Sequence, residues 1–203
     1  SIVYNGSIWV ATAMDSSTYY SPDGMTWAQG VFSYIGATST WNSLNDLLQA
    51  SDSALKNTQL NITTVSWNGY EFVAKAGEYQ DFYNNPNVNP NDAPPTTVTD
   101  VYSQDGMTWY LPANNALWGD TSQNQAFMAT IWSGSNWISV GFNSLPVYSS
   151  GSQGSSLTWT TGTNTDENSN GEGYLSLFCI ATVHALPYDQ AFAIENGSIT
   201  QEI

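Results

Sequence analysis

The sequence predicts an all-β protein made of repeated four-stranded antiparallel meanders, with one short helix in a connection. Two glycine-containing motifs that alternate along the chain predict the meanders, because each is typical of a turn between two strands. Composition points the same way. Aromatic residues make up 14% of the 203 residues and charged residues only 9%, whereas a disordered acidic chain would be poor in aromatics.

The first motif is centred on Asn-Gly or Ser-Gly. It occurs three times without gaps, at residues 3–11, 66–74 and 131–139. Each copy has one aromatic residue two places before the glycine and another three places after it. A tight hairpin needs positive φ, which glycine adopts at little cost, so each copy predicts two strands joined by a short turn.

The second motif is centred on Asp-Gly and follows the first. Residues 20–27 read Tyr-Ser-Pro-Asp-Gly-Met-Thr-Trp, and residues 102–109 differ from them at one position. A degenerate third copy runs from Tyr148 through a Gly/Ser insert to Trp159. We expect the Asp and Ser side chains to accept hydrogen bonds from the amides of their own turn, and the Trp to cap that turn from the following strand.

One repeat therefore contains two hairpins in succession, and such a four-stranded meander is one blade of a β-propeller. We expect a single repeat domain over residues 1–203. Its repeats lie at about 1–60, 61–120 and 126–165, with a degenerate fourth over 174–203. Propellers have about four to eight blades. Three ways of completing the structure therefore stay open: closure within the chain, open stacking of the sheets, or assembly with copies or neighbouring segments.

Two connections differ from the rest. Behind a Thr/Asn/Ser start, Leu44, Leu47 and Leu48 keep helical spacing, with Leu55 as a further candidate, and this predicts a short helix. Residues 78–100 are rich in Asn and Pro, which predicts a long loop between the second and third strands of the second repeat. Long loops on rigid sheets frequently carry recognition.

The Ser-x-Asp-Gly-x-Thr-Trp stretches at 21–27 and 103–109 resemble the Asp-box, or BNR, repeat of sialidase-like and related β-propellers. The family pattern has one more residue between Asp and Gly. The combined unit of both motifs also looks like repeats that are common in bacterial surface proteins and phage virion proteins. The resemblance implies propeller blades in which Asp23 and Asp105 build turns and do not catalyse.

The charge balance excludes several functions. Seventeen acidic residues against two lysines and no arginine give a formal charge of −15, so the chain would be repelled by nucleic acid and by anionic membranes. No apolar run approaches the roughly 18 residues of a membrane span, so membrane insertion is not expected. Sialidase activity is excluded as well, because that family's site holds the substrate carboxylate with arginines.

We expect no catalytic centre. The single histidine, His184, lies in an apolar strand, and no Gly-x-Ser-x-Gly segment partners it. The single cysteine, Cys179, lies in an apolar run that is typical of a buried, inert thiol. A pair of carboxylates is the open alternative. Glu71, Glu78 and Asp81 lie in or near one hairpin, and we expect them on an exposed face.

Calcium is the ion that the sequence favours. Residues 166–172 fit the opening Asp-x-Asn-x-Asn-Gly of a calcium loop, whose oxygen donors surround a hard cation at about 2.4 Å. The candidate ligands are Asp166, Asn168, Asn170 and Glu172. The twelfth position is Leu177 instead of glutamate, so the segment is not an EF-hand.

Aromatic side chains outside the repeat positions are candidates for glycan binding. Sugar rings present apolar faces that stack on Trp or Tyr, while Asn and Asp take the hydroxyls. The aromatics at repeat positions are expected to pack between blades. Those without a repeat role are Tyr79, Phe82, Tyr83 and Trp118.

The sequence therefore predicts a non-catalytic structural or adhesion protein of a virion or extracellular surface. A phage tail, fibre or capsid-surface component fits best, and this assignment rests on the resemblance. Expected partners are other virion or surface proteins, further copies in a homo-oligomer, and cell-surface glycans. Two alternatives stay open: a carbohydrate-active hydrolase that uses an Asp/Glu pair, and a calcium-stabilised, lectin-like extracellular module.

Overall fold

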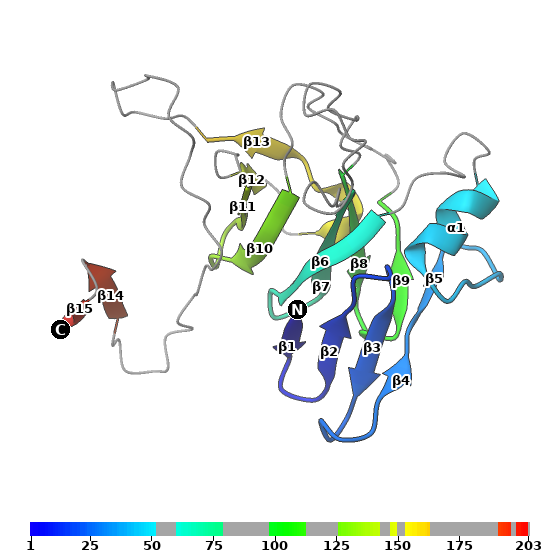
Figure 1. The fold of residues 1–203 in the computed structure, drawn as a ribbon, viewed down its shortest axis with the longest axis horizontal. Helices are drawn as coiled ribbons and strands as arrows, with labels where there is room; N and C mark the ends of the chain where they lie inside the picture. Colours follow the sequence, from blue (N-terminus) through cyan, green and yellow to red (C-terminus); the bar gives the residue numbers. More distant parts are fainter. Residues whose placement is uncertain are drawn as a thin grey trace, which may run out of the picture.

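In the computed structural model, β-strands are the main secondary structure of the described residues, beside an α-helix and a short 3₁₀ helix. The described residues are 1–51, 60–78, 98–112, 126–142, 147–149, 153–162, 191–195 and 198–202. Their strands form three sheets of four or five strands and one isolated pair (Figure 1). The all-β prediction is confirmed.

The first sheet is an antiparallel meander with the order β1-β2-β3-β4. Its strands are β1 (Ile2–Tyr4), β2 (Trp9–Thr12), β3 (Thr18–Ser21) and β4 (Ala28–Gln29). The Asn-Gly turn joins β1 to β2, with Gly6 at φ 100° and Tyr4 paired with Trp9 across it. The hairpin that the first motif predicts is therefore present.

The second sheet contains the meander of the second repeat and one extra strand. Its strands in chain order are β5 (Val31–Ser33), β6 (Leu60–Trp67), β7 (Phe72–Glu78), β8 (Val98–Ser103) and β9 (Thr108–Tyr110). Strands β6 to β9 are antiparallel, whereas β5 pairs with β9 in parallel. The fifth, parallel strand was not predicted.

The chain crosses from the first sheet to the second at Gly30. The amide of Gly30 donates to Thr18 O at 2.8 Å in the first sheet, and the amide of Val31 donates to Met107 O at 2.8 Å in the second. A Cβ at Gly30 would lie 2.5 Å from Thr18 Oγ1 and 3.1 Å from Met107 O. Only glycine fits where the two sheets approach so closely, so β4 and β5 form one segment shared by both edges.

The third sheet repeats the meander, with the order β10-β11-β12-β13. Its elements are β10 (Ala126–Trp132), β11 (Trp137–Phe142), β12 (Val147–Ser149), the 3₁₀ helix η2 (Gly154–Ser156) and β13 (Trp159–Thr161). Strands β14 (Ala191–Glu195) and β15 (Ser198–Glu202) pair only with each other among the described strands.

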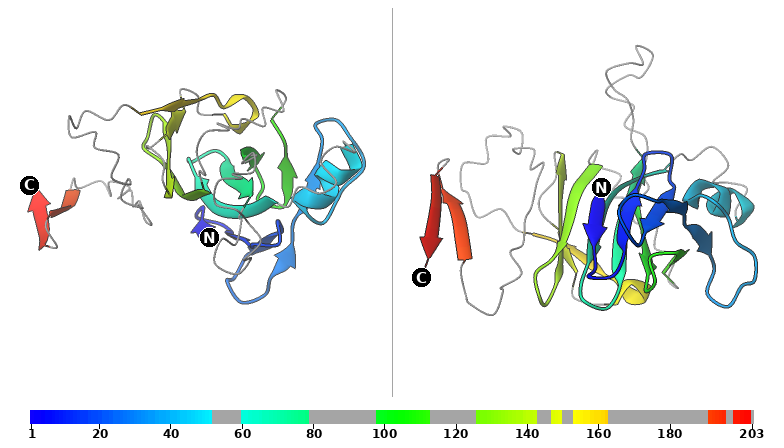
Figure 2. Two further views of the ribbon diagram at one scale, coloured as in Figure 1. Left: turned by 45° about the horizontal axis from the view of Figure 1, so that its top comes forward. Right: turned by 90° about the horizontal axis from the view of Figure 1, so that it is seen from below.

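The three sheets stand beside one another, with the second between the first and the third (Figure 2). The first strands of the three meanders, β1, β6 and β10, are linked by hydrogen bonds, β1 through Ser1, the residue that precedes it. The amide of Val65 in β6 donates to Ser1 Oγ at 3.3 Å, and the amide of Thr130 in β10 donates to Thr64 Oγ1 at 2.9 Å. The described sheets do not close into a barrel or a ring.

The helix α1 (Leu44–Ser51) lies in the connection from β5 to β6, as predicted. It begins where Ser43 Oγ accepts a hydrogen bond from the amide of Asp46 at 3.1 Å, which is an N-cap. Leu44, Leu47 and Leu48 are buried in the core between the first and second sheets. Leu55 and the body of the predicted loop, residues 79–97, lie outside the described residues.

Candidate functional site

Every binding residue predicted from the sequence lies outside the described residues. These are Tyr79, Phe82, Tyr83 and Trp118 for glycan, and Asp166, Asn168, Asn170 and Glu172 for calcium. His184 and Cys179 lie outside as well. In the part of the chain that the structure describes, no group of three or more His, Cys, Asp or Glu side chains gathers. The described site candidates are instead the turns and the contacts between sheets.

The first Asp-Gly turn is held by its own side chains. Asp23 Oδ1 accepts hydrogen bonds from the amides of Met25 at 2.8 Å and Thr26 at 2.7 Å. Ser21 Oγ donates to Asp23 Oδ1 at 2.9 Å and accepts from the amide of Gly24 at 2.8 Å. Trp27 Nε1 donates to Gly24 O at 3.2 Å. The backbone amides of Thr26 and Met25 lower the pKa of Asp23 to about 2.

The second Asp-Gly turn has the same geometry. Asp105 Oδ1 accepts from the amides of Met107 and Thr108, each at 2.8 Å. Ser103 Oγ accepts from the amide of Gly106 at 2.8 Å, and Trp109 Nε1 donates to Gly106 O at 3.3 Å. The expected roles of Asp, Ser and Trp in these turns are therefore confirmed in both copies.

The turn glycine of one sheet is the point where the preceding sheet packs. A Cβ at Gly106 would lie 2.6 Å from Val10 Cγ2 and 2.8 Å from Ile8 Cδ1, both in the first sheet or its hairpin turn. In the third sheet, a Cβ at Gly154 would lie 2.7 Å from Tyr102 Cγ in the second.

The same Gly154 Cβ would lie 3.2 Å from Val73 Cγ2. Val73 holds the repeat position of Val10. The sheet-to-sheet contact therefore recurs, with a glycine on one side and a valine on the other.

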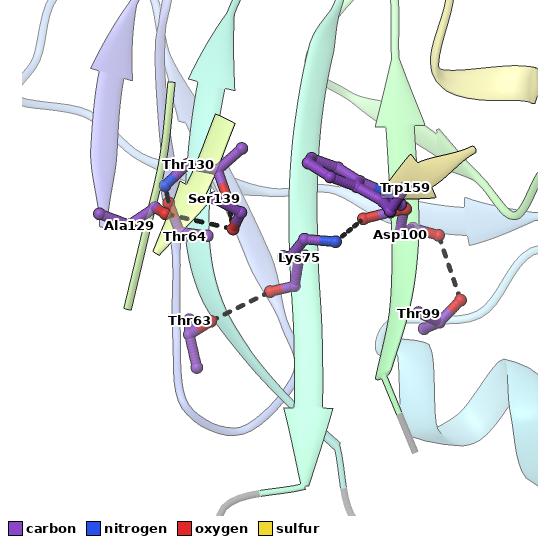
Figure 3. A network of polar contacts seen from close by, with 9 residues as sticks. All are labelled: Thr63, Thr64, Lys75, Thr99, Asp100, Ala129, Thr130, Ser139 and Trp159. Atoms are coloured by element: carbon purple, nitrogen blue, oxygen red, sulfur yellow. Dashed lines mark hydrogen bonds and ion pairs between the residues drawn. The ribbon is translucent and has the colours of Figure 1, made fainter. Parts of the chain in front are cut away.

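A buried ion pair lies in the second of these contacts (Figure 3). Lys75 Nζ lies 2.9 Å from Asp100 Oδ1, and the two side chains are 0% and 5% exposed. Trp159 of the third sheet covers the pair. Its Nε1 donates to Asp100 Oδ2 at 2.6 Å, and its ring centroid lies 3.6 Å from Lys75 Nζ. The pair therefore joins two strands of one sheet to a strand of the next.

Burial disfavours the charged form of Lys75 and lowers its pKa, and the carboxylate of Asp100 opposes this effect. Each carboxylate oxygen already accepts a hydrogen bond from the protein. Such a pair is costly to break, because the remaining charge would be left without a partner in a dry environment. Because Trp159 of the third sheet bonds to Asp100 of the second, the ion pair helps to hold these two sheets together.

A layer of threonine and serine hydroxyls continues from the ion pair (Figure 3). Thr63 Oγ1 donates to Lys75 O at 3.3 Å, next to an irregularity in the β6–β7 register. Thr64 Oγ1 accepts the amide of Thr130, and Thr130 Oγ1 lies 2.8 Å from Ser139 Oγ in a hydrogen bond. The bond between Thr130 and Thr64 connects β10 to β6, whereas the other two each join neighbouring strands of one sheet.

Glu71 corrects one prediction. We expected this carboxylate on an exposed face, but the side chain is only 2% exposed, and its Oε1 accepts a hydrogen bond from the amide of Gly154. The reason is its position, because Glu71 is the repeat equivalent of Ile8 and faces the next sheet. Burial raises its pKa, and the bond from Gly154 opposes the rise. Asp81 lies outside the described residues.

Sequence reasoning missed the ion pair, although a signal was present. Lys75 is one of two basic residues and stands inside the apolar strand Phe-Val-Ala-Lys-Ala. Asp100 stands in the similar strand Val-Thr-Asp-Val-Tyr. A lysine and an aspartate in neighbouring strands that are otherwise apolar are buried only when they are paired.

Comparison of the chain with protein-family models, with curated proteins and with solved structures finds no match. The Asp-box resemblance therefore stays a prediction. Among the described residues, no helix has the length and the apolar character to cross a membrane.

Proposed function

We propose that this chain is a non-catalytic structural or adhesion module of a virion or extracellular surface, built from propeller-like blades. The observation that carries the proposal is the recurrence of one sheet-to-sheet contact, with Val10 on Gly106 and then Val73 against Gly154. A unit that stacks by repeating one contact is typical of a scaffold. The adjacent first strands β1, β6 and β10 also support blades arranged around an axis.

The charged groups at the described contacts support a structural role. Lys75 and Asp100 are paired beneath Trp159, and Glu71 holds the backbone of Gly154. Asp23 and Asp105 are engaged by the amides of their own turns. Each of these groups therefore holds the fold together. The assignment to a phage virion, and to other surface proteins as partners, rests on the resemblance of the repeats.

Within this proposal, Tyr79, Phe82, Tyr83 and Trp118 contact glycans, and residues 166–172 hold a calcium ion that stabilises the module. Aromatic side chains suit the apolar faces of sugars, and oxygen donors suit Ca²⁺. The calcium is tested by melting the chain with and without EDTA. We expect a lower melting temperature in EDTA, and an unchanged one would remove the calcium from the proposal.

The proposal is tested by pairing a glycan array with an assay for released reducing ends on every glycan bound. We expect binding without turnover, and weaker binding for Trp118→Ala than for the chain with Tyr70→Ala. Tyr70 is a suitable control because it is an exposed aromatic on a repeat turn. Turnover that disappears on substitution of a single carboxylate would overturn the proposal in favour of a hydrolase.

A further inference from the structure

The repeated contact joins two different faces, one on a sheet and the other on the sheet that follows it. We call the first the forward face. It consists of a β-branched residue in the second strand and the tyrosine paired with it in the third. The pairs are Val10–Tyr20, Val73–Tyr102 and Ile138–Tyr148. The same register in three sheets shows that the forward face recurs in the third sheet as well.

The other face, the receiving face, consists of a glycine in the connection between the third and fourth strands of the meander and the tryptophan that follows it; this glycine is in a turn at Gly24 and Gly106 and in the 3₁₀ helix η2 at Gly154. It is Gly106 with Trp109 in the second sheet and Gly154 with Trp159 in the third. The forward face of the first sheet packs on Gly106, and that of the second packs on Gly154. The corresponding residues of the first sheet are Gly24 and Trp27.

The forward face of the third sheet and the receiving face of the first sheet are exposed, whereas the corresponding faces of the second sheet are buried. In the forward face, Tyr148 is 44% exposed, whereas Tyr102 is 8% exposed. In the receiving face, Trp27 is 37% exposed, whereas Trp109 is 0% exposed. The open faces are thus the two halves of a contact that the described chain already makes twice.

We propose that the forward face of the third sheet in one copy of this chain packs on the receiving face of the first sheet in the next copy, head to tail. The inference rests on the proposed function and names its partner as the chain itself. A contact between two different faces generates a ring when its rotation closes, and a filament when it does not. Either product suits a surface scaffold.

Charge does not oppose this contact, although the chain carries a formal −15. The forward face of the third sheet, with Ile138, Tyr148 and neighbouring Asn136, contains no carboxylate. The acid of the first Asp-Gly turn, Asp23, is bonded to its own turn amides. The proposed contact therefore places the carboxylate of Asp23 opposite uncharged residues of the forward face.

The experiment uses one variant for each face. Tyr148→Glu blocks the forward face by placing a charge where an apolar ring should be buried. Gly24→Asn blocks the receiving face, because a side chain there would meet the incoming residues, while asparagine tolerates the φ of 74° at this position. Tyr70→Glu is the matched control, since Tyr70 is 61% exposed and belongs to neither face.

Sedimentation velocity on the full chain should show species heavier than 22.1 kDa for the unaltered chain and for the Tyr70→Glu control. Each blocking variant alone should sediment as a monomer, and its circular dichroism spectrum should show that it remains folded. An equal mixture of the two blocking variants should form dimers and nothing larger, because one open face of each kind remains. The mixture distinguishes a head-to-tail contact from a symmetric one.

A monomeric unaltered chain would overturn the inference. Blocking variants that still assemble, or a mixture that stays monomeric, would overturn it too. The proposed function fails separately, through glycan turnover, and that result would leave the sedimentation outcome intact.

Discussion

The contact between the first and second sheets and the contact between the second and third both place a valine of the second strand near a glycine of the next sheet, but they differ in chemistry. Beside the forward face, Thr12 pairs with Thr18 in the first sheet, and Lys75 pairs with Asp100 at the same register in the second. The threonine hydroxyls are buried without a hydrogen-bond partner, whereas the ion pair is closed by Trp159.

The repeat therefore places equivalent strands and a glycine at each contact and leaves the chemistry of that contact free to vary. In the first contact, Ile8 and Val10 meet Gly106. In the second, Glu71 bonds to Gly154 in place of the apolar contact. Trp159 of the third sheet supplies the hydrogen bond that Asp100 Oδ2 would otherwise lack when buried. We therefore infer that Lys75 and Asp100 help to select the third sheet as the neighbour of the second.

The largest expected effect comes from breaking the ion pair. Lys75→Met leaves Asp100 buried without its cation, and we expect the free energy of unfolding to fall by about 3–5 kcal/mol. Urea denaturation monitored by tryptophan fluorescence measures the change. The double variant Lys75→Met/Asp100→Asn is the control. It should recover much of the loss, because no charge is left and Asn still accepts from Trp159. A double variant as unstable as the single one would contradict this account.

The next largest effect is expected at the turn glycines, of which Gly106 is covered by a neighbouring sheet and Gly24 is not. Gly106→Ala places a Cβ against Val10 and also strains a φ of 74°, so we expect a loss of about 2–4 kcal/mol. Gly24→Ala carries the same φ but meets no residue of another sheet, so we expect about 1–2 kcal/mol. The two melting temperatures under one set of conditions check the difference. Equal losses would show that packing at Gly106 adds nothing.

A smaller effect should appear at the first contact. Thr18→Val removes a buried hydroxyl that has no hydrogen-bond partner, and keeps the shape of the side chain. We expect the chain to gain about 1 kcal/mol in urea unfolding. Thr130→Val is the matched control and should destabilise, because Thr130 Oγ1 is hydrogen-bonded to Ser139. Destabilisation by Thr18→Val would show that its hydroxyl has a role in the first contact.

The smallest effect concerns pH. Because burial raises the pKa of Glu71 in the folded state, the folded state binds a proton more readily than the unfolded state. This group therefore favours folding most below its ordinary pKa of 4.5, and its contribution is lost as pH rises through the folded pKa. Urea midpoints from pH 4 to 7, compared with those of Glu71→Gln, should differ in slope in that direction. Identical slopes would refute the assignment.

The pKa of Asp23 is shifted in the opposite direction from that of Glu71, so the two residues can be compared in the same protein. Its pKa is lowered to about 2, so its stabilising effect is present above the ordinary value of 3.8 and disappears as pH falls toward 2. Replacing Asp23 by Asn should therefore make stability depend less on pH below about 3.8. Glu71→Gln should instead change the pH dependence above 4.5.

Local chemistry explains why the hairpins and turns could be predicted. Gly6, Gly24 and Gly106 have the positive φ that their turns require, and Asp23 bonds to amides two and three residues ahead. The N-cap of α1 is local in the same sense. By contrast, Glu71 was predicted exposed and is buried, because its environment is a glycine amide 83 positions further along the chain.

The meanders, their turns and the short helix could be read from the sequence, since each depends on residues a few places apart. The three-dimensional packing was needed to show which sheet lies against which, how Lys75 contacts Asp100 and Trp159, and which faces stay exposed. Those outcomes depend on packing between residues that are distant in the chain. A repeated motif describes each unit equally well, so it does not say which unit is covered and which is exposed.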